Sequence, residues 1–253
     1  MKNKSLEVLP QIQNKHSGVL LINKPKGKTS FSLVSSVRKL FNVQKVGHAG
    51  TLDPFATGVM ILLVGKDFTR LSDRFLNQDK EYIATMRLGI RTDSYDCEGV
   101  TLSESDFIPT EDLILEVLSR FQGPLMQVPP MFSAKKVQGK KLYELARKGI
   151  EIERAPVPIT VEIRLLAYEY PYLSIHVSCS KGTYIRSLAE DIGISLGCGA
   201  HLSDLSRTRS GPFRLSECAD GSLLSDPANI PSLRLIPLIE LPFAPSNSSQ
   251  EKQ

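Results

Sequence analysis

The residues best suited to chemistry lie between positions 47 and 58, in the stretch Gly-His-Ala-Gly-Thr-Leu-Asp-Pro-Phe-Ala-Thr-Gly. Its glycines allow positive φ angles and a close approach of the backbone to a ligand. Pro54 fixes its own φ and favours an extended conformation at Asp53, which places the carboxylate on a defined bend. We expect Asp53 to act as a nucleophile or general base; the alternative is that it only caps a turn.

The charge pattern around Asp53 favours an ionised carboxylate. Asp53 is the only acidic residue between Glu7 and Asp67, and the same interval holds eight cations. Nearby positive charge favours the anionic form of a carboxyl group. We therefore expect Asp53 to be charged at neutral pH, which suits a nucleophile or a base better than an acid.

The cysteines and histidines favour neither a metal site nor a disulfide framework. The chain has four of each, far apart and without paired spacing, so we expect reduced thiols, no metal and a cytoplasmic location. Residues 1–17 are polar and lack the apolar core of a signal peptide. No apolar run approaches the length of a membrane span, so we expect no membrane association.

A basic segment lies near the middle of the chain. The chain carries 31 basic and 27 acidic residues, a net charge of +4, and residues 135–154 alone hold seven cations and three anions. Such a patch can neutralise phosphates and attract a polyanion, although it can also be a solvated helix face. We interpret residues 124–154 as a basic insertion that clamps RNA, with Lys140, Lys141 and Lys148 as candidate contacts to the RNA backbone.

The hydrophobic pattern predicts strands and helices that position these groups. Apolar or alternating runs predict strands over 19–22, 59–64 and 80–88, and an antiparallel pair over 159–169 and 172–179. Helices are predicted from the N-cap Ser30, from the N-cap Thr110, and over 184–196 with Gly197 ending the last. Residues 91–99 are interpreted as a surface turn, because Tyr95 occupies a position where a calcium loop needs an oxygen ligand. The pattern thus predicts strand-rich stretches on both sides of the helices.

An ordered series of motifs resembles the TruB family of tRNA pseudouridine synthases. The series starts with Lys-Pro-x-Gly at 24–27 and the stretch at 47–58, and runs from about residue 18 to residue 213. Its further blocks lie at 80–82, 128–134, 139–147, 179–188, 197–202 and 205–213. A single block could arise by chance, whereas an ordered series over most of the chain is a strong signal.

The resemblance implies a pseudouridine synthase fold, an α+β domain with a central mixed and mainly antiparallel sheet flanked by helices. The catalytic domain is expected to cover residues 18–243, and residues 1–17 to form a polar extension. Residues 214–243 are expected to be a short remnant rather than a full C-terminal PUA module. Only 40 residues follow Phe213, and an independently folded module normally needs more than about 40. Residues 244–253 are expected to be a disordered tail. The family also suggests a monomer.

The resemblance assigns roles to individual residues. Asp53 becomes the catalytic carboxylate, and whether it attacks the ribose, attacks the base or takes a proton is left open. Arg186 is expected to pair with it, and Tyr82 to stack on the uracil, although Tyr82 alone would be interpreted as core. Tyr184 and Leu205 are expected to complete the pocket wall. His48 is expected to fill the space left by the flipped base. The alternative for His48 is a hydrogen bond to a loop carbonyl.

The implied activity is isomerisation of uridine 55 in the T-loop of tRNA, with the tRNA T-stem-loop as partner and base flipping as the first step. No cofactor is expected, because substrate and product are isomers. One alternative is a tRNA-folding chaperone without catalysis, which would not need a carboxylate in the pocket. The other is a carboxylate-dependent hydrolase of small molecules. The basic insertion and the lack of a second nearby acid count against the hydrolase.

Overall fold

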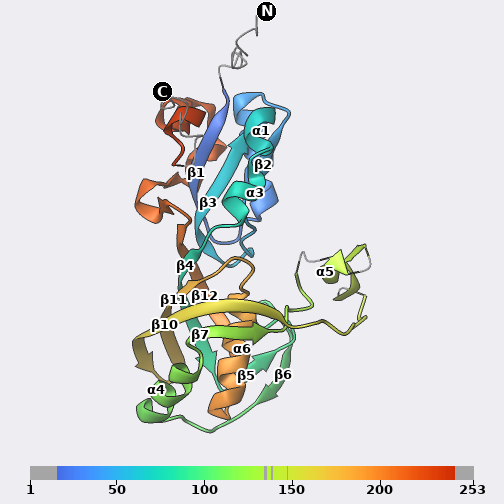
Figure 1. Ribbon diagram of the computed structural model, residues 1–253, viewed down its shortest axis with the longest axis vertical. Helices are drawn as coiled ribbons and strands as arrows, with labels where there is room; N and C mark the ends of the chain where they lie inside the picture. The colour runs from blue at the N-terminus through green and yellow to red at the C-terminus, as the bar shows by residue number, and fades with distance from the viewer. Residues whose placement is uncertain (1–15, 134–135, 138, 147, 243–253) are drawn as a thin grey trace, which may run out of the picture.

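The computed structural model describes residues 16–242 except 134, 135, 138 and 147 (Figure 1). The polar extension predicted over 1–17 therefore lies almost wholly outside the described residues, and the tail predicted over 244–253 lies entirely outside them. One sheet runs along the length of the molecule, and the segment that carries the short helix α5 (Leu142–Ala146) projects to one side (Figure 1).

The central sheet confirms the predicted mixed and mainly antiparallel arrangement. Its main path is β14-β1-β3-β12-β4-β11-β10-β7, with β2, β13 and β15 attached to it. Only the β1–β14 and β3–β12 pairs among these described strands are parallel. The strands of the path are β14 (Ala219–Asp220), β1 (Gly18–Lys24), β3 (Thr57–Val64), β12 (Ala200–Ser210), β4 (Lys80–Leu88), β11 (Tyr172–Cys179), β10 (Val157–Glu169) and β7 (Gly123–Gln127). The attached strands are β2 (Val46–His48), β13 (Phe213–Arg214) and β15 (Leu235–Ile236).

Helices cover the sheet where the predicted amphipathic segments lie. The longer ones are α1 (Ser30–Phe41), α4 (Glu111–Arg120) and α6 (Ile185–Leu196), and α6 packs along β12 and against α4. Thr110 caps α4, and Gly197 ends α6 in the left-handed conformation, as predicted. Two short helices follow β3: α2 (Lys66–Thr69) and α3 (Ser72–Leu76). Within the described ranges, no helix combines the length and the apolar character that a bilayer crossing requires.

The start of α1 differs from the prediction by one residue, and the difference bears on the site. The N-cap is Thr29, whose hydroxyl accepts a hydrogen bond from the Ser32 amide. The hydroxyl of Ser30 instead donates to the carbonyl of Leu52 at 3.0 Å and accepts from its amide at 2.9 Å. Ser30 therefore fixes the residue that directly precedes Asp53.

Two hydrophobic clusters lie on opposite faces of the sheet. Along β4, buried and more exposed residues alternate, so that Tyr82, Ala84, Met86 and Leu88 face one cluster. Every residue of β3 after Thr57 is buried, because both of its faces are covered. This buried strand anchors the segment that contains Asp53.

Two short hairpins and the final segment complete the described structure. The hairpins are β5 (Ile90–Thr92) with β6 (Thr101–Glu104), and β8 (Lys136–Val137) with β9 (Lys140–Lys141). The segment 124–154 starts in the sheet, since β7 pairs with β10, so the excursion begins after Gln127. Residues 214–242 form 3-10 turns (Leu215–Glu217, Gly221–Ser225, Pro227–Ser232 and Leu238–Glu240), while β14 and β15 pair with β1.

The close approach of β3 and β12 predicts that Gly58 cannot be replaced without loss of stability. Gly58 has φ +108°, and a Cβ there would lie 2.3 Å from the carbonyl oxygen of Arg207. We expect Gly58→Ala to lower the free energy of unfolding by at least about 3 kcal/mol in a urea titration. Gly27→Ala is the matched control, because Gly27 has φ +78° but open space around the added Cβ. It should cost only about 1 kcal/mol, and equal losses in the two variants would contradict the steric argument.

Candidate active site

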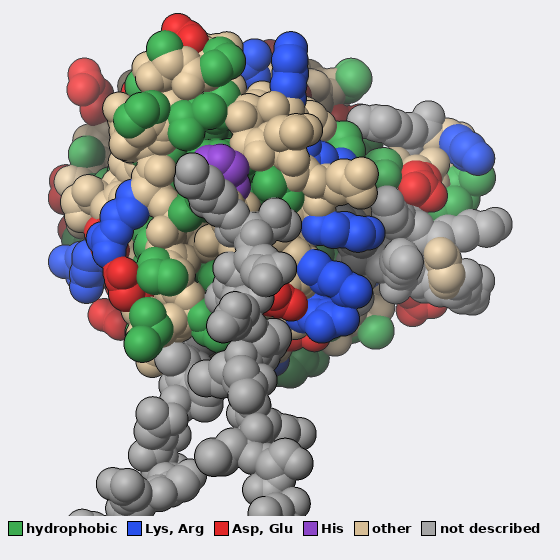
Figure 2. Space-filling model, turned by 90° about the horizontal axis from the view of Figure 1, so that it is seen from above, with side chains coloured by type: hydrophobic (Ala, Val, Ile, Leu, Met, Phe, Trp, Pro, Cys, Tyr) green, Lys and Arg blue, Asp and Glu red, His purple; other side chains and the backbone are tan. Residues whose placement is uncertain are grey.

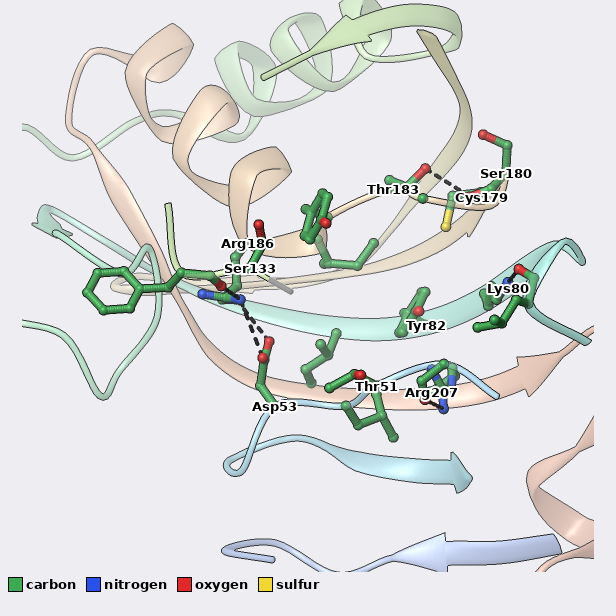
Figure 3. A pocket seen from close by; sticks show the side chains of 18 of the residues that line it. Thr51, Asp53, Lys80, Tyr82, Ser133, Cys179, Ser180, Thr183, Arg186 and Arg207 are labelled. Atoms are coloured by element: carbon green, nitrogen blue, oxygen red, sulfur yellow. Dashed lines mark hydrogen bonds and ion pairs between the residues drawn. The ribbon is translucent and has the colours of Figure 1, made fainter. Parts of the chain in front are cut away.

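A cavity of about 650 Å³ lies where the Asp53 loop, β4, β12 and the start of α6 meet (Figure 3). Its size is typical of a pocket for a small ligand. All six residues predicted for catalysis or substrate binding line it: His48, Asp53, Tyr82, Tyr184, Arg186 and Leu205. They come from segments that are distant in the sequence, and the fold brings them to one place.

The loop that carries Asp53 is held on both sides of the carboxylate. On one side, Ser30 binds both backbone groups of Leu52. On the other, the carbonyl of Pro54 accepts from the Lys24 ammonium at 3.1 Å and from the Gly27 amide at 2.8 Å. Lys24 is 0% exposed, and this burial lowers its pKa to about 8. The loop is therefore fixed by hydrogen bonds on both sides, which preorganises Asp53.

Arg186 holds the carboxylate of Asp53 by two contacts. Its Nε lies 2.9 Å from one carboxylate oxygen of Asp53, and an Nη lies 3.3 Å from the other (Figure 3). The guanidinium is itself held by the carbonyls of Ser94, at 3.1 Å, and Phe132, at 2.6 Å. The ion pair expected between Asp53 and Arg186 is thus present, with the two-point geometry that arginine provides.

A second carboxylate contacts the same guanidinium, which corrects two expectations. The Asp96 carboxylate lies 3.4 Å from Arg186 Nη1, and the residue is 4% exposed. Its other oxygen accepts from the Ser94 hydroxyl at 2.5 Å and from the Glu98 amide at 3.1 Å. The interpretation of residues 91–99 as a surface turn is therefore wrong at Asp96. The expectation that no second acid lies near Asp53 is also wrong, because counting charges along the sequence does not detect a contact between distant segments.

The electrostatic environment of Asp53 also differs from the expectation. Burial raises the pKa of Asp53, the Arg186 guanidinium opposes this shift, and the negative charge of Asp96 adds to it. The nearby cations Arg186 and Lys24 favour the anion as expected, but burial outweighs them, so the net shift of the pKa is upward. The Asp53 side chain is still 32% exposed, on the side of the cavity. A ligand in the cavity can therefore reach the carboxylate.

The opposite wall of the cavity is aromatic and aliphatic. Tyr82 on β4 points into the cavity (Figure 3), and Leu205 on the neighbouring strand β12 also lines it. Burial raises the pKa of Tyr82, so its hydroxyl keeps its proton at neutral pH. Tyr184 is the N-cap of α6, and the Gln127 side chain binds its backbone amide and carbonyl at 2.8 and 3.0 Å. These contacts give the cavity a rigid wall on which a flat ring can stack.

His48 lies on β2 at the cavity and is expected to be uncharged. Burial lowers the pKa of His48, and the positive charge of Arg207 lowers it further. Its Nδ1 is buried and has no hydrogen-bond partner within the described part of the chain. The alternative in which this nitrogen binds a loop carbonyl is therefore not seen in the described structure.

The predicted basic contacts lie on the segment that projects from the sheet. Lys148 is exposed, just after α5, and Lys140 and Lys141 form β9. Seen from above, one group of Lys and Arg side chains lies near the projecting segment, and another lies on the opposite side of the molecule (Figure 2). Phe132, Ser133 and Tyr143 from the same segment line the cavity, so the insertion is part of its wall.

Three site residues were missed in the sequence: Asp96, Lys80 and Arg207. Lys80 and Arg207 line the cavity, and Asp96 contacts Arg186. Lys80 and Arg207 fall within the blocks 80–82 and 205–213 that resemble the family, and this resemblance could have identified them as site residues. Asp96 lies in none of the blocks, and only the folded chain brings it to Arg186.

Comparisons with known proteins agree with this geometry. The model described as TruB family pseudouridylate synthase (N terminal domain) matches residues 38–185, and that of the tRNA pseudouridylate synthase B C-terminal domain matches residues 186–227. The chain is 62% identical over 228 residues to tRNA pseudouridine synthase B of Protochlamydia amoebophila, covering 90% of this chain and 86% of the relative. It is 59% identical over 210 residues to the protein of the same name from Chlamydia trachomatis serovar L2, covering 83% and 87%.

Two solved structures share the fold. A chain of a Cbf5-Nop10-Gar1 complex matches with a TM-score of 0.64 and 34% identity, over 82% of this chain and 54% of that chain. A chain of an H/ACA RNP bound to a substrate RNA containing 2'-deoxyuridine matches with a TM-score of 0.60 and 32% identity, over 82% and 52%. This chain thus spans about half the length of those two chains. A family model over more than half of the sequence, together with a relative of 62% identity over nine tenths of it, shows that the chain belongs to the TruB family of tRNA pseudouridine synthases.

Proposed function

We propose that this protein converts uridine 55 in the T-loop of tRNA to pseudouridine, with Asp53 as the catalytic carboxylate. The observation that carries the proposal is the Asp53–Arg186 pair, which faces the cavity that Tyr82 also lines. The names of the two relatives supply the tRNA substrate. The finer choice of uridine 55 rests on the resemblance of the motifs.

Base flipping follows from the position of the cavity inside the protein. Removing a stacked base from RNA costs a few kcal/mol, which contacts in the pocket must offset. Stacking on an aromatic ring contributes about 1–3 kcal/mol per base, and Tyr82 presents such a ring. An uncharged His48 can take the place of the base in the RNA stack without adding a buried charge.

The reaction is an isomerisation at a single nucleotide. The bond between N1 of uracil and C1′ of ribose breaks, the base turns, and a bond from C5 to C1′ replaces it. The proton lost from C5 is balanced by the proton gained at N1. Asp53 is the carboxylate at the cavity, and Arg186 fixes the direction in which its oxygens face. We propose that this carboxylate acts in its ionised form.

The projecting basic segment supports binding of the tRNA backbone. It is exposed at Lys148, and the same segment contributes to the cavity wall through Phe132 and Tyr143. Contacts to phosphates on this segment would therefore place the T-stem-loop next to the cavity. We propose Lys140, Lys141 and Lys148 as these contacts.

The family resemblance suggests a monomer, and we propose this as the catalytic unit. The four cysteines are free thiols, and Cys179 and Cys198 are buried. Free thiols are typical of a reducing compartment, so we propose the cytoplasm as the location.

The first test replaces the carboxylate at the cavity. We expect Asp53→Asn to lower single-turnover pseudouridine formation in a tRNA transcript by at least about 10³-fold, because the amide cannot act as a base or nucleophile. Binding of the tRNA, measured by filter retention, should remain within about threefold of the wild type. Asp67→Asn, a change at an exposed carboxylate on α2, is the matched control and should keep full activity. Turnover near the wild-type rate in Asp53→Asn would exclude the proposed role, whereas a tRNA-folding chaperone would be unaffected by the change.

The second test uses the pH dependence of the same rate. The raised pKa of Asp53 means that the carboxylate becomes protonated, and the activity falls, at a pH above the ordinary value of about 3.9 for aspartate. Because the negative charge of Asp96 contributes to this shift, Asp96→Asn should move the acid limb of the pH–rate profile to lower pH. A limb that moves to higher pH in Asp96→Asn would contradict the electrostatic assignment.

The third test removes charges from the basic segment. Changing Lys140, Lys141 and Lys148 together to Gln should weaken tRNA binding and reduce the slope of log Kd against log salt by about 1 for each phosphate that is no longer neutralised. Arg120→Gln on α4 is the control, because this exposed cation lies outside the segment. An unchanged affinity and slope in the triple variant would show that the segment does not clamp RNA.

A further inference from the structure

Arg207 is a buried cation at the cavity, and it has no role in the reaction as proposed above. It lies on β12, is 1% exposed and lines the cavity. Its Nε donates to the carbonyl of Val59 at 2.8 Å, and an Nη donates to the carbonyl of Gly50 at 3.1 Å. Val59 belongs to β3 and Gly50 to the Asp53 loop, so the guanidinium connects the sheet with the catalytic loop.

Arg207 carries a charge without a close counterion. Within the described residues, no carboxylate lies within 4.0 Å of its guanidinium, whereas Arg186 contacts two. Burying an unpaired charge is costly for stability, so a structural role alone would favour an uncharged residue at this position. The carbonyls of Val59 and Gly50 satisfy donors of the group but do not neutralise it. Its positive charge therefore acts on the surrounding groups.

The sheet places Arg207 directly opposite Tyr82. The two residues are Cα partners in the antiparallel pair of β12 and β4, and residues at such positions present their side chains on the same face. A register shift follows between Arg207 and Arg209, and bulges of this kind redirect side chains next to active sites. Arg207 lies beneath Tyr82 in the cavity (Figure 3). The positive charge of Arg207 opposes the rise in the pKa of Tyr82 that burial causes.

We propose that Arg207 is a positioning residue for the isomerisation, acting through the hydroxyl of Tyr82. In this proposal a guanidinium N–H of Arg207, which has donors only, donates to the Tyr82 oxygen, so that the Tyr82 proton is directed elsewhere, into the cavity. The inference rests on the proposed function, because it assumes that the base stacks on Tyr82.

The hydrogen bond from Arg207 has a defined place in the chemistry. When the N1–C1′ bond breaks with its electron pair left on the base, C1′ becomes electron-deficient and the uracil ring carries a negative charge until C5 bonds to C1′. The C5 proton is then lost and N1 gains one. A Tyr82 hydroxyl that accepts from a guanidinium is a stronger donor to an oxygen of this anion. Arg207 thus contributes in the step where charge develops and not in the binding of the neutral base, so it affects kcat more than KM.

The first readout is spectroscopic and does not depend on activity. The chain has seven tyrosines, so ¹³Cζ-tyrosine labelling gives few NMR signals, and the signal that is absent from Tyr82→Phe identifies Tyr82. Arg207→Gln should shift the Tyr82 signal and move its titration to higher pH, because the variant lacks a positive charge that favours the phenolate. Arg207→Lys keeps the charge and should restore part of the shift. Arg209→Gln, which removes an ion pair with Glu81 on the neighbouring strand, should leave the signal in place.

The second readout is a double-mutant cycle in the kinetics of pseudouridine formation. Arg207→Gln should lower kcat by about tenfold or more with little change in KM, and Arg207→Lys should recover part of the activity. In the Tyr82→Phe background, Arg207→Gln should cost less than about twofold, because the hydroxyl through which it acts is already absent. Arg209→Gln should stay close to the wild type in both backgrounds.

Each result supports or overturns the proposal. Equal reductions by Arg207→Gln in the two backgrounds, or an unmoved Tyr82 signal in folded Arg207→Gln protein, would overturn it and assign Arg207 to holding β3 and Gly50. If Arg207→Gln does not fold, Arg207→Lys provides the same comparison. Failure of the proposed function shows separately, in the activity of Asp53→Asn, which leaves the coupling between Arg207 and Tyr82 measurable by NMR.

Discussion

The two-point contact between Arg186 and Asp53 is the interaction that organises the site. The same guanidinium also contacts Asp96 and the carbonyls of Ser94 and Phe132, so it joins the catalytic loop, the segment before β6 and the start of the basic insertion. A planar group with five donors can serve all these acceptors at once, which a lysine cannot do. The position of Asp53 is thus tied to the segment proposed to bind tRNA.

Buried cations form a second common feature of the site. Lys24 and Arg207 are both almost fully buried, and both donate to backbone carbonyls of the segment 50–54 or its neighbours. They fix the loop without placing a further carboxylate next to Asp53, so the loop is held rigidly while its acid stays available to a ligand. Arg186 alone, among these three cations, pairs with carboxylates in the described structure.

The amino-acid pattern predicted most of the framework and part of the site, for physical reasons that differ between residues. The alternation along residues 80–88 and the Gly197 helix end are local signals, and the structure has both elements. The site residues assigned through the family resemblance gather at one cavity. Asp96 could not be predicted, because its contact with Arg186 depends on how two distant segments pack. The upward shift of the Asp53 pKa could not be predicted, since it depends on burial, which a count of nearby charges omits.

The catalytic arrangement is tested most directly by a structure of the protein bound to a T-stem-loop RNA that carries an unreactive analogue of uridine 55. We expect an everted base stacked on Tyr82, with the C1′ of its ribose within about 3.5 Å of the Asp53 carboxylate, and His48 in the space that the base has left. A base that stays stacked in the RNA loop, or a ribose bound away from Asp53, would show that this cavity does not carry out the isomerisation as proposed.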